Sequence, residues 1–355
     1  MIDQDCAQDV LAAASPDIDE AQAAQLARRH FGIDAQVRRL AGERDRNFHL
    51  RADDGREYVL KFSHPAEDAR VADFQARALR HVEQADPGLP VQRVLLANDG
   101  EPCVWLQTPD APPRVLRLFS YLPGLPLPDA PRSAAQRDNL ARTLARLGLA
   151  LRGFTHPAAQ LDLPWDIQRT DEVAPLLAHV TDPARRALAE RGLARFVNHA
   201  KPALPGLRAQ AIHNDLNLYN VLVDPADPDR IAGILDFGDM VQAPLVNDLA
   251  VAASYQLEPG DDALAPAVAF TAAYHAVSPL TPAELDVLFD LMVARLVMVV
   301  AIGGWRAARY PENSAYILRN NAVSWARLQA CDGIARDEAR QRLRAACGFE
   351  PCGLQ

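Results

Sequence analysis

With 355 residues, of which 49% are hydrophobic and 23% charged, the chain is long enough for two lobes with full cores and has the balance of a soluble protein. Its net charge of −9 argues against a nucleic-acid partner, because binding to phosphates requires a positive surface. The five cysteines form no C-x-x-C pair and the acidic N-terminus shows no signal-peptide pattern, so we expect a cytoplasmic protein with no membrane segment.

The first 120 residues are expected to form a small lobe around an antiparallel sheet. Ser15-Pro16-Asp17 predicts the start of a helix that ends at Gly32. Apolar side chains at helical spacing predict a second helix over residues 66–83. Strand-like runs separated by turn signals occur at 36–40, 47–51, 57–62, 91–97, 104–107 and 114–118.

Residues 121–128 contain three prolines and a glycine, which predicts a linker between two lobes. Residues 129–355 are expected to form a larger and mainly helical lobe, which gives an α+β fold in two lobes. Helical patterns occur at 134–153, 173–179, 183–200, 247–257, 263–276, 282–302 and 314–344. Short strands are predicted among them at 211–213, 221–223 and 231–235.

One constellation in the second lobe predicts chemistry. His213-x-Asp215-x4-Asn220 is followed sixteen residues later by Asp236-Phe237-Gly238. Phosphoryl transfer needs a carboxylate to accept the proton of the attacking hydroxyl and oxygen ligands for magnesium. Asp215 fits the first role, while Asn220 and Asp236 fit the second. The alternative is a turn rich in Asn and Asp with no chemistry, which the Asp-Phe-Gly motif after a hydrophobic strand disfavours.

The first lobe contains candidate phosphate-binding residues. Lys61 is a lone cation in an apolar strand, from which a lysine can reach nucleotide phosphates. The alternative is an edge-strand lysine that faces solvent. The turn that ends with Arg46 and Asn47 lies between two predicted strands, where a turn that covers the phosphates is expected.

The chain resembles the aminoglycoside phosphotransferase and choline kinase-like family, whose fold is similar to that of protein kinases. The matching motifs are Tyr58-Val59-Leu60-Lys61, Leu122-Pro123-Gly124, the segment 212–222 around Asp215, Ile234-Leu235-Asp236-Phe237-Gly238-Asp239 and Asn247-Asp248-Leu249-Ala250. A closer similarity to hydroxylysine kinase and its bacterial relatives rests on Arg44-Asp45-Arg46-Asn47-Phe48, Asp73-Phe74-Gln75, Phe154-Thr155-His156-Pro157, Trp165-Asp166 and the segment 311–316.

The resemblance implies Mg²⁺ and a nucleotide co-substrate, ATP or GTP, whose base binds the backbone of Ser120, Tyr121 and Leu122. It implies that Asp248 and His213 brace the catalytic loop and do not react. Many relatives pair the strand lysine with a glutamate on the first-lobe helix. Here the best-spaced residue is Gln75, with Asp73 nearby, so either Asp73 substitutes or nucleotide phosphate holds the lysine.

Two charged residues and one aromatic residue are candidates for binding the acceptor substrate. Arg295 interrupts an apolar helix, and a buried arginine needs a carboxylate, either from the protein itself or from an amino-acid substrate. Asp166 could meet a substrate ammonium beside the Trp165 ring, or it could cap the helix that follows.

We therefore expect a kinase for a hydroxy-amino acid or amino alcohol such as 5-hydroxylysine, acting as a monomer or homodimer. Homoserine, choline, ethanolamine or an aminoglycoside remain alternative acceptors. A catalytically inactive nucleotide-binding scaffold is a further alternative, which the complete set of base and metal ligands disfavours. A metal-dependent hydrolase would need clustered His and carboxylate ligands, which the sequence does not show.

Overall fold

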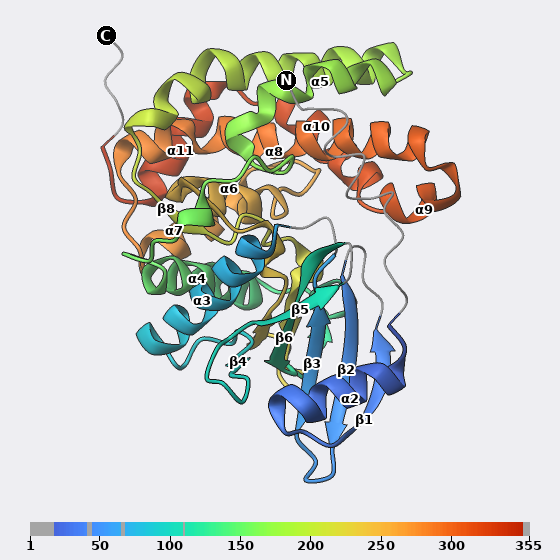
Figure 1. The fold of residues 1–355 in the computed structure, drawn as a ribbon. Coiled ribbons are helices and arrows are strands. Elements are labelled where there is room, and N and C mark those ends of the chain that lie inside the picture. The colour runs from blue at the N-terminus through green and yellow to red at the C-terminus, as the bar shows by residue number, and fades with distance from the viewer. Residues whose placement is uncertain (1–17, 41–44, 65–67, 109–110, 351–355) are drawn as a thin grey trace.

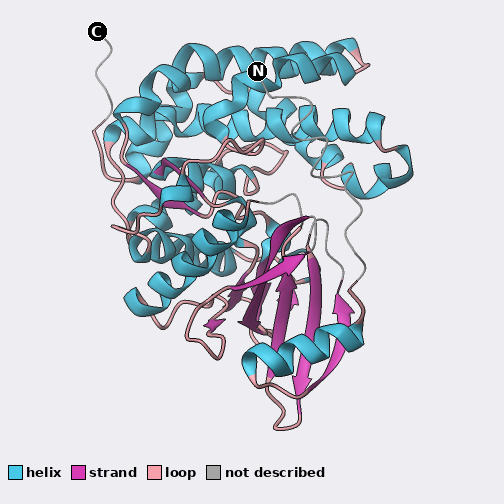
Figure 2. Ribbon diagram, in the orientation of Figure 1, coloured by secondary structure: helices cyan, strands magenta, loops and turns pink. Residues whose placement is uncertain are grey.

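The computed structural model describes residues 18–40, 45–64, 68–108 and 111–350. A lobe built on one antiparallel sheet lies against a larger lobe of helices (Figure 1). Figure 2 shows that most of the strand residues lie in the smaller lobe. The predicted fold class, an antiparallel-sheet N-lobe with a mainly helical C-lobe, is confirmed.

The N-lobe sheet has the strand order β1-β2-β3-β6-β4, and β5 also pairs with β6. Its strands are β1 (Ala35–Leu40), β2 (Arg46–Ala52), β3 (Glu57–Phe62), β4 (Val94–Leu95), β5 (Val104–Thr108) and β6 (Ala111–Ser120). The predicted strand 91–97 is much shorter here, because Val91 forms a parallel bridge to Ile234 of the C-lobe instead of extending the sheet. β3 lies between β2 and β6, so Lys61 is on a central strand and not on an edge.

Helix α2 (Glu20–Phe31) lies across one face of this sheet (Figure 1). Asp19 caps its N-terminus in a reciprocal pair with Gln22, and Gly32 ends it at φ 65°, a left-handed conformation that glycine adopts without strain. The predicted helix end is therefore confirmed, while Ser15-Pro16-Asp17 lies outside the described residues. Ala23 and Ala27 are fully buried against the sheet, because small side chains allow close packing.

Helix α3 (Ala69–Ala85) joins the two lobes. Its Phe74 ring stacks on Phe154 of the C-lobe at 5.9 Å between centroids and on His156 at 5.5 Å. The apolar side of α3 thus belongs to the same buried core as the C-lobe helices, while the sheet and α2 enclose a separate small core. The position of α3 relative to the C-lobe is therefore fixed by buried aromatic packing.

The predicted linker is more ordered than its prolines suggest. Leu125–Pro126 forms the short strand β7, and Leu127–Asp129 continues as a 3₁₀ turn, η1. β7 is an edge strand of the C-lobe sheet β10-β9-β7, where a proline is tolerated because one side of an edge strand needs no donor. The predicted linker segment 121–128 therefore contains regular structure of the C-lobe.

The C-lobe packs around helix α8, which is buried over most of its length. Its helices are α4 (Ala134–Ala150), η3 (Ile167–His179), α5 (Pro183–Arg195), α6 (Leu245–Ser254), α7 (Ala265–His275), α8 (Pro282–Arg309), α9 (Ser314–Ile317), α10 (Asn321–Asp332) and α11 (Arg336–Ala346). The single helix predicted over 314–344 is wrong, because turns at 318–320 and at Gly333 break it into three. Within the described parts of the chain, no helix is long and apolar enough to cross a membrane.

Two small sheets hold the segments with the phosphoryl-transfer motifs. β9 (Val221–Val223) pairs with β10 (Ile231–Ile234), and β8 (Ala209–Ile212) pairs with β11 (Val241–Pro244), a strand that the sequence patterns did not predict. Because β9 and β10 are antiparallel, the residue before β9 and the residues after β10 lie at the same edge. Asn220 and Asp236 are therefore brought to one place, which fits the short strands predicted at 221–223 and 231–235.

Candidate active site

Three side chains hold the carboxylate of Asp215, two from its own loop (His213 to Asn220) and one from α8. Arg295 Nη2 donates to its Oδ1 at 2.6 Å. Its Oδ2 accepts from the side-chain amides of Asn217 and Asn220, each at 2.9 Å. Burial raises the pKa of Asp215, the guanidinium of Arg295 lowers it, and nearby Asp236 raises it, with a net rise. Such a carboxylate accepts a proton more readily than an exposed one.

His213 and Asp248 both contact the backbone of this loop. The His213 ring accepts from the Asp215 N–H through Nδ1 at 3.2 Å, so its Nε2 carries the proton donated to the Leu235 carbonyl at 3.0 Å. The Asp248 carboxylate accepts from the N–H groups of Asn214 at 2.8 Å and His213 at 3.3 Å. Neither side chain lines a cavity, which is the position expected for residues that support the loop.

Asn220 and Asp236 bring further oxygen atoms close to Asp215. Asn220 Nδ2 donates to both the backbone oxygen and the side-chain Oδ2 of Asp215, which leaves its own Oδ1 for another partner. Asp236 has φ 58°, an uncommon conformation for a residue other than glycine and one often found at functional sites. Its Oδ1 accepts from Gly238 N–H, where a Cβ would lie only 2.8 Å from that oxygen. The two side chains form an oxygen-rich pair that fits a hard divalent cation.

Lys61 forms an ion pair with Asp45 at 2.9 Å, and Asp45 also accepts from His64 N–H at 3.0 Å. Burial lowers the pKa of Lys61, but the carboxylates of Asp45 and Asp236 hold it above its ordinary value. Neither expected helix residue pairs with the lysine. Gln75 accepts from Arg117 at 2.7 Å, and Asp73 binds Arg77 and His156. The alternative in which Asp73 pairs with Lys61 is therefore wrong, and the alternative in which nucleotide phosphate holds the lysine stays a prediction.

Asp45 is the functional candidate that the sequence did not single out. It lies immediately before β2, within a charged segment where no spacing rule distinguishes a buried acid from a solvated one. Its importance depends on register, because Asn47 lies opposite Lys61 in the β2–β3 pair and so brings Asp45 close to the lysine. No local pattern in the sequence carries that information.

Two adjoining cavities meet at these residues. The first, which we call the hinge slot, has a volume of about 600 Å³ and lies between the sheet and β9. Its apolar walls include Val59, Phe119, Leu122, Leu222 and Leu235. The second, which we call the large cavity, has a volume of about 780 Å³ and reaches α8 and the segment after it. Both are lined by Asn47, Lys61, Gln75, Asn220, Asp236 and Gly238, so they share the polar centre.

The hinge slot admits some of the expected nucleotide contacts. Tyr121 and Leu122 line it. The N–H groups of Ser120 and Tyr121 already donate to Arg93 and Glu57, so Leu122 offers the backbone N–H in this segment for a base. Ser120 and Arg46 line neither of these two cavities, so their contact with a nucleotide stays a prediction. Asn47 does line both.

The large cavity contains two of the three predicted acceptor residues. Arg295 is only 3% exposed, and its guanidinium lies 5.1 Å from the centroid of the Trp165 ring. The carboxylate that pairs with Arg295 therefore comes from the protein itself. Unexpectedly, it is that of Asp215. Asp166 instead accepts from the backbone and side chain of Gln168 and caps η3. This corrects its assignment to the acceptor site.

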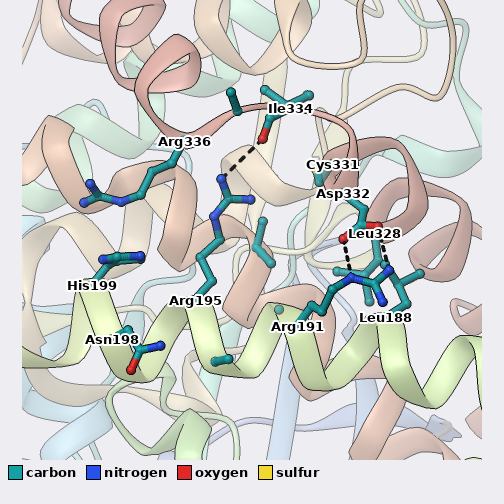
Figure 3. A pocket seen from close by; sticks show the side chains of 14 residues that line it. Leu188, Arg191, Arg195, Asn198, His199, Leu328, Cys331, Asp332, Ile334 and Arg336 are labelled. Carbon is teal, nitrogen blue, oxygen red and sulfur yellow. Dashed lines mark hydrogen bonds and ion pairs between the residues drawn. The ribbon is translucent and has the colours of Figure 1, made fainter.

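A separate cavity of about 330 Å³ lies between α5 and α10, away from these residues (Figure 3). Arg191 pairs there with Asp332 at 2.6 Å, and Arg195 donates to the carbonyl of Ile334 at 3.3 Å. Its arginines are thus matched by acceptors of the protein itself. Its lining includes none of the residues of the motifs at 213–220 and 236–238.

Comparison with known proteins agrees with this geometry. Residues 36–288 match the model of the phosphotransferase enzyme family. The chain belongs to this family. The phosphotransferase is 27% identical over 342 residues to hydroxylysine kinase of Mus musculus, covering 90% of each chain. It is 30% identical over 280 residues to homoserine kinase of Cupriavidus necator, covering 75% of this chain and 79% of that one.

The fold of the phosphotransferase is also found among solved structures. The amicoumacin kinase solved with AMP-PNP, Ca²⁺ and amicoumacin has a TM-score of 0.62 and 17% identity, covering 85% of this chain and 89% of that one. This similarity confirms the kinase-like fold. The protein is an enzyme that transfers a phosphoryl group to the hydroxyl of a small molecule. Within the described residues, no group of three or more His, Cys, Asp or Glu side chains could hold a metal ion.

Proposed function

We propose that this phosphotransferase transfers the γ-phosphate of ATP or GTP to the hydroxyl of a hydroxy-amino acid or amino alcohol similar to hydroxylysine. The observation that carries the proposal is the position of Asp215. Its carboxylate lies in the large cavity, and its amide partner Asn220 also lines the adjoining hinge slot. A nucleotide base in the apolar slot and an acceptor in the large cavity would meet at this carboxylate. The similarity to hydroxylysine kinase over 90% of both chains supports this acceptor class.

Each polar side chain then has a role. Asp215 accepts the proton of the attacking hydroxyl, since it is the base best placed for that hydroxyl. Asn220 and Asp236 would hold Mg²⁺, which neutralises charge on the phosphates when it is bound. Lys61 and Asn47 contact phosphate oxygens from the sheet side, and the Leu122 backbone binds the base. His213 and Asp248 keep the loop in the conformation that places Asp215.

The lining of the large cavity bears on the alternative acceptors. Arg295, Arg306 and Arg319 line it, in a chain whose net charge is −9. The same cavity is also lined by five carboxylates, those of Asp45, Asp162, Asp215, Asp236 and Asp239, so its charge does not discriminate against polycationic aminoglycosides. Homoserine remains the alternative with a specific observation in its favour, because a homoserine kinase is 30% identical over 280 residues and homoserine also carries a carboxylate. A nucleotide-binding scaffold without activity would have no need for a supported base beside two metal ligands.

A coupled nucleotide-consumption screen tests the proposal. Hydroxylysine, homoserine, choline, ethanolamine and aminoglycosides are each offered with ATP and with GTP. We expect turnover with an amino acid that carries a hydroxyl. Asp215→Ala should abolish turnover while MgATP still binds, and Asp236→Ala should remove magnesium-dependent binding. Asp262→Ala, which breaks a surface ion pair with Arg342, is the matched control. Absence of consumption with every acceptor would refute the enzyme assignment for these substrates.

A further inference from the structure

The buried side chain of Arg295 joins the acceptor side of the site to the catalytic base. It lies in the middle of α8 and is 3% exposed. One guanidinium nitrogen donates to Asp215 Oδ1 at 2.6 Å, and the other donates to the backbone oxygen of Trp165 at 3.3 Å. The central carbon of the guanidinium lies 5.1 Å from the centroid of the Trp165 ring. A buried guanidinium needs an anionic partner, and in this state Asp215 provides the ion pair, while the Tyr255 hydroxyl and the charge of Asp239 also favour the guanidinium.

This contact restrains the group that has to act as the base. Oδ2 of Asp215 is occupied by the amides of Asn217 and Asn220, which leaves Oδ1 as the oxygen that can approach a substrate hydroxyl. Arg295 occupies that oxygen. A charge-assisted hydrogen bond to a guanidinium stabilises the carboxylate and makes it a weaker proton acceptor. The base is therefore held in a resting ion pair when the cavity contains no acceptor.

The geometry points to an exchange of partners at Arg295, and this inference rests on the proposed function. An acceptor that carries a carboxylate places it against the Arg295 guanidinium and takes over the ion pair from Asp215. Arg295 keeps an anionic partner throughout, so no buried charge is left uncompensated. Asp215 Oδ1 is released for the hydroxyl of the same acceptor. Arg295 is thus a specificity-determining residue that selects α-carboxylates and makes the base available only when one is bound.

The rest of the site is compatible with this exchange. Trp165, Asp215 and Arg295 all line the large cavity, so an acceptor can reach the ion pair from inside it. Trp165 holds the guanidinium from the side through its ring and its carbonyl, which keeps Arg295 in place when Asp215 leaves. Amino alcohols lack a carboxylate and therefore cannot replace Asp215 in the ion pair with Arg295. They should therefore be poor acceptors although they carry both the hydroxyl and the amine.

The test compares 5-hydroxylysine with 1,5-diaminopentan-2-ol, which lacks only the carboxylate. For the wild-type enzyme we expect kcat/KM to favour hydroxylysine by at least about 30-fold, the range for a buried charge pair. In Arg295→Met this preference should fall to about 1, with turnover of the diamino alcohol equal to or above that of wild type. Arg295→Lys should show an intermediate preference, because an ammonium keeps the positive charge but lacks the paired N–H donors of a guanidinium. Arg342→Met, which removes a surface arginine, should keep the wild-type preference.

A second readout does not depend on the acceptor. If Arg295 restrains Asp215, Arg295→Met should hydrolyse MgATP to ADP and phosphate faster than wild type, with water as the nucleophile and Asp215 taking its proton. Asp215→Asn added to Arg295→Met should remove the gain. Thermal unfolding shows that each variant is folded. Equal losses for both acceptors in folded Arg295→Met, or no gain in hydrolysis, would overturn the exchange. If wild type phosphorylates neither compound, the proposed acceptor class is wrong and the hydrolysis comparison still decides the restraint.

Discussion

Removal of the Asp248 carboxylate tests whether the support below the catalytic loop is what positions the base. In Asp248→Ala the N–H groups of Asn214 and His213 lose their buried acceptor. Each unsatisfied buried donor costs about 1–3 kcal/mol, which gives about 2–6 kcal/mol for the two. Part of this is offset, because burial raises the pKa of Asp248, which shows that the charged form is itself unfavourable there. We expect a net loss of about 3 kcal/mol in the free energy of unfolding.

The kinetic consequence should be larger than the structural one. Asp215 follows the two supported residues directly, so a loop that relaxes by about 1 Å should lower kcat about 100-fold. The KM for MgATP should change little, because Asn220 and Asp236 are attached to the β9–β10 hairpin. Urea unfolding and initial-rate kinetics measure the two effects. Asp248→Asn keeps one acceptor oxygen, so its loss of unfolding free energy should be about half of that in Asp248→Ala. If kcat of Asp248→Ala stayed within about twofold of wild type, Asp248 would not be needed to position Asp215.

Three further predictions concern the nucleotide side and the base. Asp45→Asn removes the ion pair of Lys61, so the KM for MgATP should rise about tenfold in initial-rate assays; an unchanged KM would mean that phosphate alone orients the lysine. In Gly124→Ala the added Cβ would lie 2.7 Å from Leu222 Cβ in the hinge slot, so calorimetry should show weaker nucleotide binding and a loss of about 1–3 kcal/mol in stability. Equal nucleotide affinity would contradict this reading of the slot. Asp215 acts as a base only when it is deprotonated, and burial is the main cause that raises its pKa above the ordinary value of an aspartate, about 4. As the pH is lowered, activity should therefore begin to fall while the pH is still above about 4. An acidic limb of kcat/KM below that pH would count against Asp215 as the base.

Local sequence determined the parts of this protein that depend on short-range rules. The strands β2 and β3 follow from short runs with apolar side chains between turn signals, and α2 ends where Gly32 can adopt a positive φ. The sequence also predicted Asp215, Asn220 and Asp236, because the chemistry of phosphoryl transfer restricts the residue types and β9–β10 pairing restricts their spacing.

Only the tertiary structure decided which charges meet. Lys61 pairs with Asp45 because β2 and β3 align in one register, and Arg295 pairs with Asp215 because α8 passes behind the catalytic loop. The helix predicted over 314–344 is broken for a similar reason, since apolar spacing does not show where a chain must turn to pack against α8. Ion pairs between residues 80 positions apart leave no periodic trace in a sequence, because each partner alone resembles an ordinary charged residue. The acceptor specificity inferred for this enzyme therefore rests on a contact that folding creates.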